Sequence, residues 1–82
     1  MSTVVASNHQ NSPIDTLKKG QMGIISHFSD DQMATKLMAM GVLPGSVVTV
    51  IRSAPFGGGF YVKIDTMVIA LRKQETRCII LK

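Results

Sequence analysis

The sequence is poor in the residues that build disulfide scaffolds, membrane spans and aromatic cores. Its 82 residues include one cysteine, Cys78, and no tryptophan, and 5% of them are aromatic. A single cysteine cannot form an internal disulfide, which excludes a disulfide-stabilised secreted scaffold and fits a reducing compartment. No stretch reaches the roughly 18 consecutive apolar residues of a membrane span, and residues 1–16 lack the apolar core of a signal peptide. We therefore expect a soluble, cytoplasmic protein.

The chain is short and basic, and its positive charge is concentrated in the second half. A chain of 82 residues fits one domain with a thin core, because so small a domain hides only about 60% of its unfolded surface. The formal net charge is +4, and all of the excess falls within residues 42–82. Such a surface could contact phosphates, anionic lipid head groups or an acidic protein.

Turn residues divide the chain into short segments. Residues 1–13 are rich in Ser, Asn and Gln without periodicity, which predicts a flexible leader before a single domain at residues 14–82. A sheet of such short strands removes its exposed edges when it curls closed. We therefore expect a mainly β, small SH3-like or OB-like barrel. Apolar and β-branched runs predict its five strands, at residues 22–28, 46–54, 60–64, 67–71 and 77–81.

One helix is expected after the first of these strands. Ser29 and Gln32 have the spacing of a capping box, which predicts the helix start. Gly41 stands where a left-handed helix cap is needed, and Pro44 forbids continuation. The sequence therefore predicts a short helix that stops abruptly and leads directly into a strand.

The helix carries more apolar side chains than a small barrel can cover. Met33, Leu37 and Met40 recur at helical spacing and are expected to face the core. Met38 widens the apolar arc, and Leu43 follows soon after. Because methionine is an adaptable contact residue, an uncovered remnant predicts a docking patch, although Met38 filling a groove at the barrel rim explains it equally well.

Catalytic patterns are missing, and the sequence predicts no enzyme and no resident cofactor. Asp30 and Asp31 are adjacent, but neighbouring side chains at a helix start point apart and complement the helix dipole. The glycine run 57–59 lacks the Lys-Ser/Thr of a phosphate-binding loop and precedes a strand, where such a loop precedes a helix. It predicts a hairpin turn instead.

Two further functions stay open on the residues alone. If the first and last strands pair, His27 and Cys78 approach each other and could make a weak ferrous or zinc contact, as in a metal-sensing module, although a tight site uses three or four ligands. A small nucleic-acid-binding barrel would need a basic stripe with stacking rings. We expect no nucleic-acid partner, because the rings are few. The basic residues concerned are Arg52, Lys63, Arg72 and Lys73, with Phe56 and Tyr61 as the rings.

A longer motif resembles a known family. Its parts are KLMAMGVLPGS at residues 36–46, VTVIR at 48–52, APFG at 54–57, and ALR at 70–72 with Glu75 and Ile79. In this order and at this spacing they resemble the FeoA family of ferrous iron transport accessory proteins, over about residues 14–81. Thr76 departs from the pattern, which usually has a small Ala before the last strand.

The resemblance implies a fold, a compartment and a partner. It implies an SH3-like barrel in the bacterial cytoplasm that binds the cytosolic region of FeoB, a membrane ferrous iron transporter with a GTP-binding domain. Repressors of the diphtheria-toxin-repressor type carry the same fold behind a helix-turn-helix, which is not found ahead of the barrel in this sequence. A homo-oligomer stays open. The motif and the uncovered apolar side chains together predict a partner-binding surface made of Leu37, Met38, Met40, Leu43, Pro55, Phe56 and Gly57.

Overall fold

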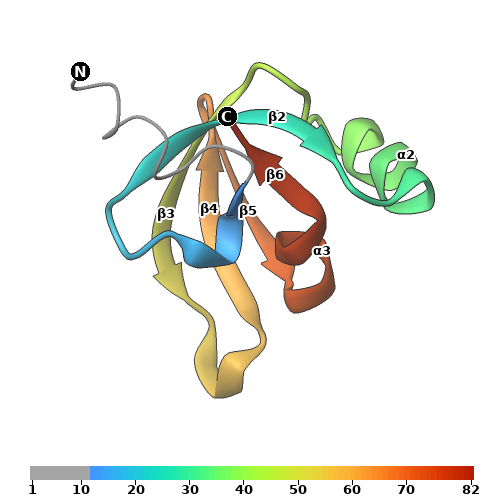
Figure 1. Cartoon of the computed structure of the whole chain (residues 1–82). Helices are drawn as coiled ribbons and strands as arrows, with labels where there is room; N and C mark the ends of the chain where they lie inside the picture. The colour runs from blue at the N-terminus through green and yellow to red at the C-terminus, as the bar shows by residue number, and fades with distance from the viewer. Residues whose placement is uncertain (1–11) are drawn as a thin grey trace.

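The structure, a computed structural model, describes residues 12–82, which form one curled antiparallel sheet with short helices at its ends (Figure 1). The strands lie in the order β1-β6-β2-β3-β4-β5. They are β1 (Ser12–Pro13), β2 (Met22–Phe28), β3 (Val47–Ser53), β4 (Gly59–Ile64), β5 (Met67–Arg72) and β6 (Ile79–Leu81). The helices are α2 (Asp31–Ala39) and α3 (Lys73–Cys78), with 3-10 turns η2 (Ile14–Thr16) and η3 (Pro55–Gly57).

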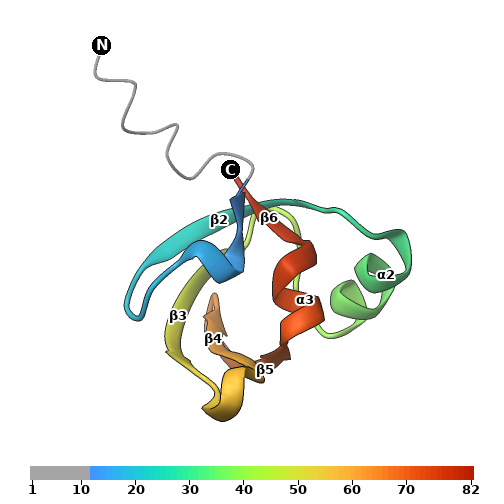
Figure 2. The same ribbon diagram turned by 60° about the horizontal axis from the view of Figure 1, so that its bottom comes forward.

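Alternation along the strands builds the core. In β4, Val62 and Ile64 are buried while Lys63 is exposed, as the period-two pattern predicts. Strands β1 and β5 are the two edges of the sheet, and α3 connects β5 to β6 and contacts η2, so the gap between the edges is filled by helix (Figure 2). The mainly β fold with one helix inserted after β2 is confirmed.

Two ends of the predicted strand pattern differ from the structure. Ser12 and Pro13 form β1, paired with Leu81 and Ile80, although the sequence assigned them to a leader. The rest of that predicted leader, residues 1–11, lies outside the described residues. The last strand begins at Ile79, not at residue 77, because the preceding six residues form the helix α3. Six polar-rich residues carry too little periodicity to reveal a helix that tertiary packing stabilises.

The start of α2 also differs from the prediction by one residue. The carboxylate of Asp30, not the hydroxyl of Ser29, caps the helix by accepting the backbone NH of Met33 at 2.9 Å. The backbone NH of Ser29 donates to the carbonyl of Cys78 at 2.9 Å, which ties Ser29 to the chain entering β6. Both residue types make good caps, and this tertiary hydrogen bond shifts the helix start to the second of them.

The end of α2 follows the prediction. Gly41 has φ +94°, and the NH of Val42 donates to the carbonyl of Leu37 at 2.9 Å while the NH of Gly41 donates to that of Met38 at 3.0 Å. These are the two hydrogen bonds of a Schellman motif. Leu37 and Val42 are both completely buried, so the motif directs both side chains into the core.

The glycine run at the β3–β4 hairpin contains one position that accepts no other residue. Gly59 has φ +126°, and a Cβ there would lie 1.9 Å from the carbonyl oxygen of Leu71 on the neighbouring strand β5. Gly58 has φ −80°, and its nearest neighbour would be the carbonyl oxygen of Pro55 at an ordinary 3.4 Å. The run therefore serves strand packing, and Gly59 is its essential member.

We expect Gly59→Ala to lower the free energy of unfolding by about 3 kcal/mol or more, because the backbone must change conformation and move away from β5. Gly58→Ala is the matched control and should change it by less than about 0.5 kcal/mol. Urea unfolding of the three proteins measures both values. Equal stability of the two variants would contradict the assignment.

Candidate partner-binding surface

Apolar side chains are exposed beside the end of α2. Met38 is 43% exposed on the helix, Leu43 is 47% exposed in the connection to β3, and Met67 is 38% exposed at the start of β5. Met67 reaches the helix end, because a Cβ on Gly41 would lie 3.0 Å from the Met67 Cε. We call Met38, Leu43 and Met67 the methionine surface. The contact residues predicted from the sequence do not include Met67, because only the fold places β5 against the end of α2.

Two of the predicted contact residues, Leu37 on α2 and Met40 at its C-terminal cap, lie deeper than Met38. Leu37 is completely buried, so it belongs to the core beneath the methionine surface and has no exposed atoms for a partner. Met40 is half-buried and packs against the core. A helix turns by about 100° per residue, so neighbouring Leu37 and Met38 cannot both face inward. Burial of Leu37 therefore fixes the outward position of Met38.

The predicted hairpin residues form a separate exposed site. Pro55, Phe56 and Gly57 make up η3 at the tip of the β3–β4 hairpin, and the Phe56 ring is fully exposed. The tip, drawn in yellow-orange, and α2 lie at different ends of the molecule in both views (Figures 1 and 2). The single surface expected from the sequence is thus divided into a methionine surface and a hairpin tip.

An ion pair fixes α2 to α3. The Lys36 Nζ on α2 lies 2.9 Å from the Glu75 Oε2 on α3, and the Glu75 Oε1 accepts the backbone NH of Arg72 at 2.7 Å. Glu75 is almost completely buried. Burial raises the pKa of its carboxyl, but the hydrogen bonds from Lys36 and from the NH of Arg72, with the nearby positive charges, outweigh burial and hold the pKa below its usual value of 4.5.

The two metal-ligand candidates do not form a site together. His27 is exposed and pairs with Ile80, with its Nδ1 3.0 Å from the hydroxyl oxygen of Ser26. The thiol of Cys78 is buried and donates to the carbonyl of Glu75 at 3.3 Å. Burial and the charge of Asp30 raise the pKa of the Cys78 thiol, which disfavours the thiolate that a metal needs. Within residues 12–82, no three His, Cys, Asp or Glu side chains are grouped to hold a metal ion.

The basic candidates lie in two places: Arg52 and Lys63 lie near Tyr61 on the neighbouring strands β3 and β4, and Lys73 begins α3. The guanidinium of Arg52 sits 4.7 Å from the centroid of the Tyr61 ring and covers it, so that ring is not a free stacking platform. Lys63 is exposed on the same strand as Tyr61. Lys73 lies at the other side of the hairpin, where it lines a pocket. The two candidate rings therefore differ, because Arg52 covers Tyr61 whereas Phe56 is exposed at the hairpin tip.

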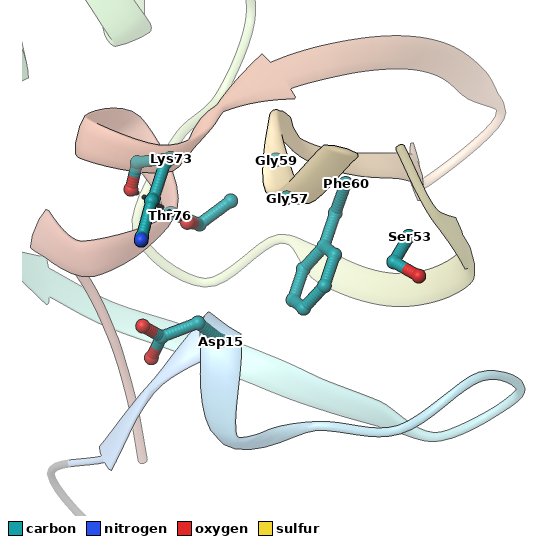
Figure 3. A pocket seen from close by; sticks show the side chains of 7 residues that line it. All are labelled: Asp15, Ser53, Gly57, Gly59, Phe60, Lys73 and Thr76. Carbon is teal, nitrogen blue, oxygen red and sulfur yellow. Dashed lines mark hydrogen bonds between the residues drawn. The ribbon is translucent and has the colours of Figure 1, made fainter. Parts of the chain in front are cut away.

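That pocket lies between the β3–β4 hairpin, η2 and α3. Its volume is about 190 Å³, and the ring of Phe60 projects into it (Figure 3). Its lining includes one carboxylate, Asp15, and one ammonium, Lys73. Thr76, which differs from the usual family residue, also lines the pocket. Its hydroxyl has a hydrogen-bond partner, because it donates to the carbonyl of Lys73 at 2.8 Å. The lining residues are Asp15, Ser53, Gly57, Gly59, Phe60, Lys73 and Thr76.

These features define a small barrel with apolar side chains exposed at the end of α2 and at the hairpin tip. Comparison with known proteins gives the family: the FeoA domain matches residues 12–82, and the chain belongs to the FeoA family, which is associated with ferrous iron transport. The resemblance in the sequence is thereby confirmed. No curated protein matches the chain. Within residues 12–82, no helix has the length and apolar character needed to cross a bilayer.

Solved structures share the fold. A FeoA-like protein from Clostridium acetobutylicum is 19% identical with a TM-score of 0.78, covering 89% of this chain and 86% of that one. The FeoA of Stenotrophomonas maltophilia, complexed with zinc and described as a prokaryotic SH3 domain protein, is 20% identical with a TM-score of 0.70, covering 85% and 88%. A manganese-dependent transcriptional repressor is 20% identical with a TM-score of 0.78, covering 88% of this chain and 40% of its own. The SH3-like barrel is confirmed.

The lowered pKa of Glu75 predicts acid sensitivity. A carboxyl whose pKa is lower when folded stabilises the fold above its unfolded pKa and loses that contribution as the pH falls through the folded value. We therefore expect the free energy of unfolding to decrease as the pH drops from about 5 to about 3, and Glu75→Gln or Lys36→Met to flatten this decrease. Urea unfolding across that pH range measures the slope. Identical slopes in the parent and both variants would disprove the role of the pair.

Proposed function

We propose that this protein is a cytoplasmic accessory factor of ferrous iron uptake that binds the cytosolic GTP-binding region of a FeoB-type transporter. The methionine surface is the proposed contact. Membership of the FeoA family supports the link to ferrous iron transport. The Stenotrophomonas maltophilia relative has been considered as a ferrous iron transport activating factor, which supports an accessory role.

One observation carries the choice of surface. Met38 and Leu43 belong to the family motif, yet both remain more than 40% exposed, and Met67 extends them across to β5. Exposed apolar side chains that gather at one place on a small protein mark interaction sites more often than isolated ones do. Methionine adapts its shape to a partner at little cost, which suits a contact surface.

The scaffold beneath this surface favours binding without rearrangement. Leu37 anchors one side of α2 in the core, and the Lys36–Glu75 ion pair fixes the same helix to α3. Side chains held on a rigid element lose less freedom when they bind, so less of the binding energy is spent on ordering. We propose that the barrel serves to hold α2 and the following connection in a fixed position for the transporter.

We expect Met38→Glu and Leu43→Glu each to weaken binding to the purified cytosolic region of a FeoB-type transporter by about tenfold or more, because each places a charge in an apolar contact. Calorimetric titration measures the dissociation constants. Both side chains are exposed, so the thermal unfolding midpoints should stay close to the parent value.

Met22→Glu is the matched control, because Met22 is an exposed methionine at the opposite end of β2 from α2. It should bind like the parent. If Met38→Glu and Leu43→Glu also bind like the parent, the methionine surface is not the contact. If all three variants lose binding equally, a general charge effect explains the loss instead.

A further inference from the structure

The outside of the sheet formed by β2, β3, β4 and β5, which we call the outer face, carries large apolar side chains that stay exposed. In β3, Val48 and Val50 are buried. Alternation along the strand therefore turns Val47 and Ile51 outward. Five apolar side chains of the outer face are between 37% and 62% exposed. The five are Met22, Ile24, Val47, Ile51 and Val68.

The outer face is also positively charged. The strands β2, β3, β4 and β5 contain no Asp or Glu. Arg52 and Lys63 are exposed on β3 and β4, and Arg72 is exposed at the end of β5. A bulge in β3 places the Arg52 guanidinium over the Tyr61 ring. None of the three cations takes part in the salt bridge found within residues 12–82, so their charges have no carboxylate partner there.

Basic and apolar side chains alternate across the outer face. Lys63 of β4 lies opposite Val68 of β5 in the register of the sheet, and Tyr61 of β4 lies opposite Arg52 of β3. Side chains in opposite positions of neighbouring strands are about 5 Å apart. A partner that covers this face must therefore offer negative charge and apolar groups close to each other.

The shape and the chemistry of the outer face together favour a lipid surface. The face is the outside of a curled sheet and is therefore convex (Figure 2). The phosphates of a nucleic acid match the cations but leave Ile24 and Val68 without apolar contacts. A protein partner would need an acidic and apolar groove of matching curvature. A bilayer with anionic head groups presents negative charge directly above its acyl chains, and it deforms around a convex surface.

We propose that the outer face binds the surface of a membrane that contains anionic lipids. The three cations contact the head groups, and the apolar side chains between them enter the boundary between head groups and acyl chains. Each Lys or Arg near an anionic surface strengthens binding by about fivefold, so three cations with shallow apolar contacts give reversible binding. Neighbouring residues of a strand point to opposite sides, so Val68 faces away from Met67, and the methionine surface stays free for a protein.

Co-sedimentation of the protein with lipid vesicles tests this proposal. At about 0.15 M salt, we expect the parent to bind phosphatidylcholine vesicles with about 30% phosphatidylglycerol, but not vesicles of phosphatidylcholine alone. Lys63→Glu should weaken binding to the anionic vesicles by about tenfold or more, because it replaces an attraction by a repulsion. Arg77→Glu is the matched control, because Arg77 is exposed on α3 and the variant has the same net charge. It should weaken binding by less than about threefold, since salt screens distant charges.

Val68→Ser separates the apolar contact from the charge. The variant keeps the net charge of the parent, and Val68 is exposed, so the fold should be kept. We expect it to weaken binding to the anionic vesicles by about threefold or more, because less apolar surface enters the membrane.

Three outcomes would overturn the proposal. A parent that does not bind the anionic vesicles would point instead to an acidic protein as the partner of the outer face. Equal losses in Lys63→Glu and Arg77→Glu would show that net charge alone drives binding. Unchanged binding of Val68→Ser would show that the apolar side chains stay outside the membrane. The vesicles contain no transporter, so each outcome is independent of the proposed function.

Discussion

The chain reversal at Gly41 is the constraint on which the arrangement depends. Its left-handed backbone ends α2, returns the chain to the sheet and buries Leu37 and Val42 together. With these two side chains inside, Met38 and Leu43 have no room in the core and remain outside. The absence of a side chain at Gly41 also lets Met67 of β5 approach, so one backbone conformation produces both the core and the surface above it.

Features set by nearby residues could be predicted from the sequence, and features set by distant ones could not. The bounds of β2, the alternation in β4 and the cap at Gly41 depend on neighbours in the chain, and the structure agrees with each. The helix start moved to Asp30 because of a hydrogen bond between Ser29 and Cys78, which are far apart in sequence. For residues 72–76 the sequence predicts only a single turn, whereas the structure forms the six-residue helix α3, which packs across the gap between the sheet edges.

The candidate site shows the same division. Exposure of Met38, Leu43 and Phe56 agrees with local patterns, but their distribution over two ends of the barrel does not appear in any local pattern. Nor does the pocket, which joins Asp15 near the start of the chain to Lys73 near its end. The curling of the sheet, with α3 across the gap between its two edges, creates these neighbours, and this curling involves the whole sheet.

The pairing of β1 with β6 brings Ser12 next to Leu81, so the described segment begins and ends at one corner of the barrel. A short linker could therefore join these two residues, and the chain could be reopened at another exposed turn, such as Asp65–Thr66 between β4 and β5. Circular permutation of this kind would leave α2 and the hairpin tip in place.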